Sequence, residues 1–466
     1  MRAALARGPV ALAALLSLLQ CAREPAVRGP ARHVIFVSFD TARKDHFGCY
    51  GNPWIRTPRI DALAAESILF TDYMTVVPTT LASHTSLFTG KYAHTHGTPR
   101  NGFMVNEENV MLAEILKDAG FHTAGFAASF PLSSRFAFAQ GFDHYDEDFE
   151  TLPDVGARGQ PERDARAVTD AAIAYLKAQG VPERLFLFLH YFDAHAPYAP
   201  PPSYAAPYAA DPRIPAWLEA REGPWSHEAA DTGKALRYAG EMTAMDEHFG
   251  RVLDYLDARG VLDEAIVVVT SDHGENFWGH FRPWDHGNTV YQSTVDAICM
   301  IRLPGALHGG TRIEPLFASI DVLPSVLSYL DLPVPPGIDG EAVDLTAVPI
   351  ALGPRTRFSQ ATKPHERVET DPRWTNIRKA ACVREGNWKY AFVPFLELEE
   401  LFDLAADPFE QRNLLVAPTA EEAKRAIQMR EVLERWVQSA APLASEFEWE
   451  HRADTERKLR ALGYLR

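Results

Sequence analysis

The stretch His33-Val-Ile-Phe-Val-Ser-Phe39, directly followed by Asp40, decides the fold class of this chain. It is an apolar run of strand length, and similar runs recur at residues 185–189 and 265–270, with helical segments between them. Strands that are covered on both faces read as unbroken apolar runs. The pattern therefore predicts an α/β fold in which a mostly parallel sheet is sandwiched by helices.

Three segments have clear helical periodicity, at residues 57–67, 111–119 and 235–259. Pro58 suits the first turn of the first segment, and Gly120 and Gly260 are stop signals for the other two. These segments alternate with the apolar runs, so we expect them to cover the sheet.

A cluster of prolines, Pro333, Pro335 and Pro336, marks a domain boundary near residue 335. Beyond it we expect short strands at residues 389–393 and 400–402, a helix at 419–439 and a charged tail from Glu446. We therefore divide the chain into a leader and tether at residues 1–30, a catalytic domain at 31–335 and a smaller C-terminal α+β subdomain at 336–466.

The bulk composition limits the classes of partner. The 466 residues carry a net charge of −16, which repels nucleic acid and anionic membranes. A small anionic substrate would need a locally positive site, and a bound cation provides one. The four cysteines, Cys21, Cys49, Cys299 and Cys382, have no CxxC spacing, so they exclude a zinc finger and leave room for one disulfide.

The first residues read as an export signal. Arg2 and Arg7 precede an apolar run at residues 10–19 that is too short to span a bilayer as a helix. Leu18-Leu19-Gln20-Cys21 resembles a bacterial lipobox, which would place a lipid anchor on Cys21; ordinary signal-peptidase cleavage nearby and an unprocessed leader are the alternatives. We expect an exported protein, periplasmic or on the outer surface, without a transmembrane helix.

Residue types that bind metals follow all three predicted strands. Asp40 follows the first, residues 190–195 follow the second, and Ser271-Asp272-His273 follows the third. Taken alone, each is more often a helix cap or a turn residue. Because the carboxyl ends of parallel strands meet at one edge of a sheet, Asp40, Asp272 and His273 are expected to form a site for Zn²⁺, Mn²⁺, Mg²⁺ or Ca²⁺.

Thr80 opens a helix-like segment, Thr80-Leu-Ala-Ser-His84, shortly after Pro78. A hydroxyl at a helix N-terminus faces backbone N–H groups that can hold an anion. Coordination of this hydroxyl to a metal would lower its pKa and make it a nucleophile.

Together these segments resemble the sulfatase family of the alkaline phosphatase superfamily. The resemblance runs in order from His33 to Leu414, and its motifs are Val37-Ser-Phe-Asp40, Leu87-Phe-Thr-Gly-Lys-Tyr92, His190-Tyr-Phe-Asp-Ala-His195, Ser271-Asp-His-Gly-Glu275, Asp285-His-Gly287, Asn387-Trp-Lys-Tyr390 and Asp407-Pro-Phe-Glu410. It implies a metal bound by Asp40, Thr80, Asp272 and His273. It also implies that His195 and His286 act in catalysis, and that Asp193, His195, His286 and His84 contact the substrate or a second metal ion.

The chain departs from the family pattern at three places. Thr80 occupies the position of the cysteine or serine that sulfatases convert to formylglycine, and a threonine cannot be converted in this way. Ala127-Ala-Ser-Phe130 replaces the usual Gly-Lys-Trp-His, so the lysine and histidine that clamp a sulfate are absent from their usual places. Asp40-Thr41 replaces the typical double Asp, which reduces the ligand set of the first metal.

These departures leave several functions open. The threonine favours a hydrolase of phosphate diesters or phosphonate esters, because threonine-using phosphodiesterases and phosphoethanolamine transferases occur in the same superfamily. The alternatives are a sulfatase that works without formylglycine, a transferase, and a non-catalytic metal- or anion-binding protein. Residues 200–225, rich in proline and aromatic side chains, are expected to form a lid or pocket wall, and the oligomeric state is open.

Overall fold

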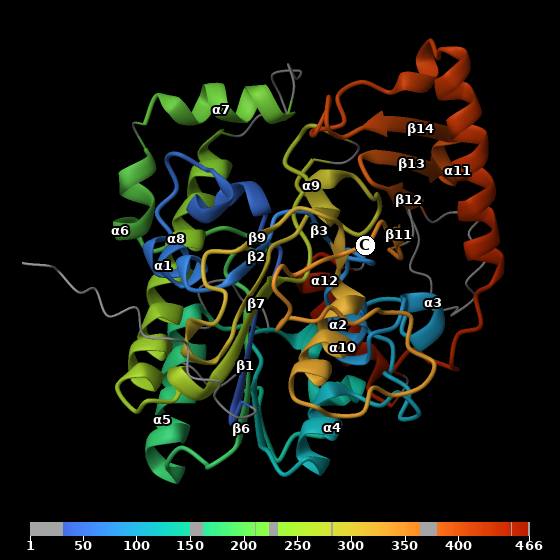
Figure 1. Cartoon of the computed structure of the whole chain (residues 1–466). Helices are drawn as coiled ribbons and strands as arrows, with labels where there is room; N and C mark the ends of the chain where they lie inside the picture. The colour runs from blue at the N-terminus through green and yellow to red at the C-terminus, as the bar shows by residue number, and fades with distance from the viewer. Residues whose placement is uncertain are drawn as a thin grey trace, which may run out of the picture.

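The computed structural model describes residues 31–149, 162–209, 211–222, 232–280, 283–363, 380–448 and 450–464 (Figure 1). The predicted leader at residues 1–30, with its lipid anchor at Cys21, lies outside the described residues, and so does the end of the predicted lid from residue 223. Cys49, Cys299 and Cys382 are free thiols. Within the described ranges, no helix combines the length and the apolar character needed to cross a membrane.

The main sheet has the strand order β5-β4-β6-β1-β7-β8-β2-β9 across the described residues. Its strands are β1 His33–Phe39, β2 Ile68–Phe70, β4 His122–Phe126, β5 His144–Asp146, β6 Leu185–Tyr191, β7 Ala265–Ser271, β8 Cys299–Arg302 and β9 Arg312–Ile313. The three apolar runs of the sequence are the central parallel strands β6, β1 and β7, and β8 runs antiparallel to both of its neighbours. The predicted mostly parallel sheet is confirmed.

Two layers of helices cover this sheet (Figure 1). One face carries α1 Pro58–Ala65, α5 Ala165–Gln179 and α8 Thr232–Asp257, and the other carries α2 Thr80–Thr89, α4 Leu112–Asp118 and α10 Ser319–Tyr329. The three predicted helices correspond to α1, α4 and α8. Phe36 of β1 packs on Phe88 of α2 and Phe188 of β6, with ring centroids 5.2 Å and 6.2 Å away, so α2 is held against the sheet centre.

Shorter elements complete the large domain. They are β3 Tyr73–Met74, α3 Ala93–His96, α6 Pro202–Ala205, α7 Arg213–Glu222, α9 Gln292–Val295 and β10 Phe317–Ala318. The described part of the predicted lid therefore contains α6 and α7.

A small antiparallel sheet follows, with strands β11 Thr356–Gln360, β12 Ala381–Glu385, β13 Trp388–Val393 and β14 Leu398–Asp403. Helix α11, Ala420–Gln438, covers it, and Thr419 and Glu422 cap the helix start reciprocally. The expected C-terminal α+β subdomain is confirmed. The boundary at residue 335 stays a prediction, and Val343 and Leu345 still pack in the main core.

The charged tail does not stay with the small sheet, although the sequence grouped the two together. After α11 the chain returns to the large domain and forms α12, Arg452–Ala461, which contacts the short turn Phe130–Leu132 (Figure 1). Phe447, Leu459, Leu462 and Tyr464 belong to the main hydrophobic core. Gly102, at φ +92°, makes room for this packing, since a Cβ there would lie 2.5 Å from the Phe447 ring.

Candidate active site

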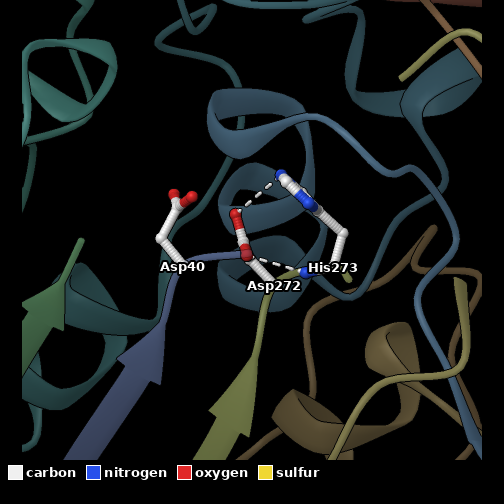
Figure 2. A group of neighbouring side chains, drawn as sticks. All are labelled: Asp40, Asp272 and His273. Carbon is white, nitrogen blue, oxygen red and sulfur yellow. Dashed lines mark hydrogen bonds and ion pairs between the residues drawn. The ribbon is translucent and has the colours of Figure 1, made fainter. Parts of the chain in front are cut away.

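The ends of β1 and β7 bring two carboxylates together. Phe39 pairs with Ser271 in the parallel register, so Asp40 and Asp272 leave the sheet side by side (Figure 2). One ligand atom each from Asp40, Asp272 and His273 lies within 4.8 Å of the other two, and all three residues are fully buried. The predicted trio is therefore assembled at the carboxyl edge of the sheet, as the strand ends indicated.

Asp272 and His273 each keep one polar atom without a hydrogen-bond partner in the described structure. The backbone N–H groups of Thr41 and His273 donate to Oδ1 of Asp272, over 3.0 Å and 2.7 Å, which leaves Oδ2 unbonded. His273 Nδ1 is 2.9 Å from the carbonyl of Gly274 and donates to it, so the unbonded Nε2 carries a lone pair. This Nε2 faces Asp272 Oδ2 at 3.3 Å. Two lone pairs at this distance repel unless a proton or a cation lies between them. Together with Asp40, these carboxylate and imidazole donors fit a divalent metal ion.

Asp40 is held by two further contacts. The Thr41 hydroxyl donates to Oδ1 over 2.5 Å, and His190 Nε2 lies 3.2 Å from Oδ2. Burial alone would raise the pKa of Asp40, but the His190 hydrogen bond and nearby His273 hold it well below its ordinary value. Burial and the charge of Asp40 raise the pKa of Asp272 well above its ordinary value. A cation at this edge would allow both carboxylates to be ionised.

Helix α2 begins beside the carboxylates and carries Thr80 as its first residue. The Ser83 hydroxyl donates to the Asp272 carbonyl over 2.8 Å, which ties the first turn of α2 to the end of β7. Thr80 is fully buried, and its Oγ1 lies 3.1 Å from the hydroxyl of Tyr464. The structure therefore brings the predicted nucleophile to the same end of the sheet, and its role as a metal ligand stays a prediction.

His84 is bonded within the protein rather than directed into open space. Its Nδ1 lies 2.8 Å from the Thr80 carbonyl and its Nε2 lies 2.9 Å from the Ser38 hydroxyl. Burial lowers the pKa of His84 to about 3, with His190 adding to the effect, so the ring is neutral. This geometry favours a role for His84 as a hydrogen-bond partner that links α2 to β1, rather than as a contact of the substrate or of a second metal ion.

His195 and His286 form a second group next to His273. The His286 ring lies 4.4 Å from the His273 ring and 5.2 Å from the His195 ring. His195 Nδ1 is bonded to the Ala196 carbonyl over 2.8 Å, and Nδ1 of His286 lies 3.4 Å from Glu275 Oε1. In the described structure, Nε2 of both histidines has no hydrogen-bond partner. Burial lowers both pKa values to about 4, so at neutral pH both rings are uncharged.

Asp193 and Lys363 border this histidine pair. Asp193 Oδ1 accepts the N–H of Ala165 at the start of α5, so the structure gives this carboxylate a helix-capping contact. Its part in a second metal site stays a prediction. Lys363 Nζ lies 2.5 Å from Oδ1 of Asp285, the residue before His286. Lys363 therefore forms an ion pair with the residue next to His286, and, in addition to burial, its charge also lowers the pKa of His286.

Two residues of this site were not predicted from the sequence, whereas His190 was predicted only as part of the segment after the second strand. Lys363 and Tyr464 lie far from the motifs in sequence, and only tertiary structure brings them to His286 and Thr80. No local pattern around Tyr464 indicates an active-site role.

Comparisons with known proteins identify the family and the fold. A family model described as Sulfatase matches residues 32–332. An ulvan-active sulfatase from Formosa agariphila is 27% identical over 445 residues, covering 89% of this chain and 84% of the relative. The multifunctional alkaline phosphatase superfamily protein PehA from Trinickia caryophylli is 26% identical, covering 78% of this chain and 87% of that protein. The crystal structure of phosphonate monoester hydrolase of Agrobacterium radiobacter shares the fold, with a TM-score of 0.69 at 19% identity over 88% of this chain and 96% of that chain.

Proposed function

The chain belongs to the sulfatase family of metal-dependent ester hydrolases, and from this premise we propose that it attacks small anionic esters through Thr80. The proposed substrates are phosphate diesters or phosphonate esters. One observation supports the assignment above the others. The buried Thr80 hydroxyl lies at the N-terminus of α2, and the first turn of this helix is bonded to the end of β7, which carries Asp272.

Asp40, Asp272 and His273 would hold the cation, with Zn²⁺, Mn²⁺, Mg²⁺ or Ca²⁺ as candidates and one or two ions per chain. When bound, such an ion lowers the pKa of a hydroxyl ligand and neutralises charge on the ester oxygens. The chain supplies the nucleophile, the positioning of the substrate and the transfer of protons.

In the first step, a bond forms between Thr80 Oγ and phosphorus while the bond from phosphorus to the leaving-group oxygen breaks. The Thr80 proton passes to the unprotonated Nε2 of His195, or to the unprotonated ring nitrogen of His286, and then to the leaving group. In the second step, water attacks phosphorus and Thr80 Oγ departs with a proton. Because both histidines are neutral at rest, they begin as bases, and each becomes an acid only after taking a proton.

The nature of residue 80 supports phosphorus esters over sulfate esters. Threonine cannot become formylglycine, so its ester must be cleaved by water at the central atom. Sulfate ester hydrolysis without formylglycine is the second candidate, since relatives such as the ulvan-active sulfatase are named for sulfate chemistry.

The test compares aryl sulfate, aryl phosphate, diaryl phosphate and aryl phosphonate esters on the zinc- or manganese-loaded protein. We expect Thr80→Ala to lower turnover of the phosphorus esters by roughly a thousandfold or more, with metal content unchanged. Thr85→Ala is the matched control, because Thr85 is another buried threonine of α2 and its hydroxyl bonds to the Leu81 carbonyl.

Full activity in Thr80→Ala would disprove the nucleophile assignment. Thr80-dependent preference for the sulfate ester would make the protein a formylglycine-independent sulfatase. No turnover of any of the four esters despite bound metal would contradict the proposed substrate class and favour a binding role.

A further inference from the structure

The C-terminal tail, residues 440–464, brings a tyrosine hydroxyl to the proposed nucleophile. The Tyr464 hydroxyl lies 3.1 Å from Thr80 Oγ1, and among the described residues no other group is hydrogen bonded to that oxygen. The Tyr464 ring also lies 5.3 Å from the ring of His195 and 6.0 Å from the ring of His286. A single side chain therefore contacts the nucleophile and borders both catalytic histidines.

The tail is integrated into the large domain. The Thr455 hydroxyl donates to Glu448 over 2.6 Å, and Arg135 donates to Asp454 over 2.8 Å. Leu459 and Leu462 are buried in the same core as the strands of the main sheet. This packing is typical of a fixed wall of the domain rather than of a mobile lid.

The same loop positions the tail and the nucleophile. Asn101 accepts the N–H of Leu81 over 2.8 Å in the first turn of α2. Two residues later, Phe103 forms a backbone bridge with Phe447, and the N–H of Glu448 donates to the Gly102 carbonyl over 2.9 Å. Residues 101–103 therefore set the position of Thr80 relative to Tyr464.

We infer that Tyr464 is a catalytic residue that donates a hydrogen bond to Thr80 Oγ and orients this oxygen for attack; the inference rests on the proposed role of Thr80. A threonine hydroxyl rotates freely about its Cβ–O bond and needs a partner that selects one lone pair. A phenol keeps its proton at neutral pH and can be that partner. In the second step negative charge develops on the departing Thr80 Oγ, and hydrogen bonds to charged oxygens are stronger than neutral ones.

Tyr464→Phe tests the inference, because phenylalanine keeps the ring beside His195 and His286 and removes only the hydroxyl. Stopped-flow measurement with an aryl phosphonate ester that releases a coloured phenolate gives the rate constant of the first step. We expect this rate constant to fall roughly 10- to 100-fold. The substrate concentration at half-maximal rate should change less than about twofold, because the lost contact is to the nucleophile rather than to the substrate.

Two further measurements show that the site is otherwise intact. Zinc titration should give the same stoichiometry and affinity in Tyr464→Phe, since within the described residues Tyr464 makes no hydrogen bond to Asp40, Asp272 or His273. Mass spectrometry of acid-quenched samples should show the ester on the peptide containing Thr80 accumulating more slowly. Tyr390→Phe is the matched control, because the Tyr390 hydroxyl bonds to Glu399 in the small sheet, and its rate should equal that of the wild type.

An unchanged rate in Tyr464→Phe overturns the inference, and so does a faster rate, which would mean that the tail obstructs the site. Thr80→Ala separates the two proposals. If Thr80→Ala is inactive while Tyr464→Phe behaves as wild type, only this inference fails. If Thr80→Ala is active, the proposed function fails as well.

Discussion

Lys389 and Glu410 form a buried ion pair that connects the small sheet to the loop after His286. The Lys389 ammonium lies 2.6 Å from Glu410 Oε1, and both side chains are completely buried. The ammonium also donates to the Val290 carbonyl over 2.5 Å, and Glu410 Oε2 accepts the N–H of Gln292 over 2.5 Å. These bonds lie four to six residues after His286, so the pair supports the loop that carries this histidine.

Replacing Lys389 by methionine keeps most of the side-chain volume and leaves the Glu410 carboxylate buried without its counterion. Removing one partner of a buried ion pair costs about 3–5 kcal/mol, because the remaining charge stays desolvated. In the double variant Lys389→Met/Glu410→Gln no charge remains, so no ion is left desolvated without a partner. We expect the double variant to lie within about 1–2 kcal/mol of the wild type.

Equilibrium unfolding in guanidinium chloride, followed by tryptophan fluorescence, measures these differences. Trp388, next to Lys389 on β13, lies in the region affected. A single variant that loses less than about 1 kcal/mol would show that the carboxylate is effectively solvated and would refute the argument. A double variant no more stable than the single one would show that lost packing, rather than the unpaired charge, causes the destabilisation.

Two other predictions concern the metal and the pH dependence of stability. Asp272→Asn keeps the acceptor for the N–H groups of Thr41 and His273 but loses the charge on Oδ2. Changes around metal ligands typically lower metal affinity roughly 10–100-fold, and we expect zinc affinity measured by titration to fall by more than this in Asp272→Asn. The circular dichroism spectrum should be unchanged. In an unfolded chain the pKa of an aspartate is about 3.9. Burial raises the pKa of Asp246 in α8 to about 7, although two backbone N–H groups donate to this carboxyl group and oppose the shift. Because the folded protein then binds this proton more tightly, the contribution of Asp246 to the free energy of unfolding is complete below about pH 4 and is lost as the pH rises to about 7. Unfolding of wild type and Asp246→Asn between pH 5 and 8 should therefore show the wild type losing about 2–4 kcal/mol relative to the variant, and parallel curves would contradict this.

The sheet and the metal-ligand group were predictable from sequence because they depend on local signals. An unbroken apolar run identifies a strand covered on both faces, and the residue after it must lie at the carboxyl edge of a parallel sheet. Asp40, Asp272 and His273 follow from these two rules together with the metal-binding chemistry of their side chains. The start of α2 at Thr80 was likewise visible in the sequence around it.

The sequence predicted the charge of the tail but not its packing. Thr455, Leu459 and Leu462 recur at spacings of four and three and form a buried stripe on and just beyond α12. Even that stripe would not have indicated which surface it covers. The contact between Tyr464 and Thr80 spans 384 positions and depends on the loop at residues 101–103, so it is a property of the tertiary structure.

The sheet supports the two halves of the site unequally, so we expect them to differ in local stability. Asp40 and Asp272 directly follow strands with partners on both sides, whereas His195 and His286 lie on connections between elements. Hydrogen exchange slows with the free energy needed to open a segment, so amides near the carboxylates should exchange more slowly than those near the two histidines. On gradual warming, we expect the protein to lose binding of the ester before it loses binding of the metal ion.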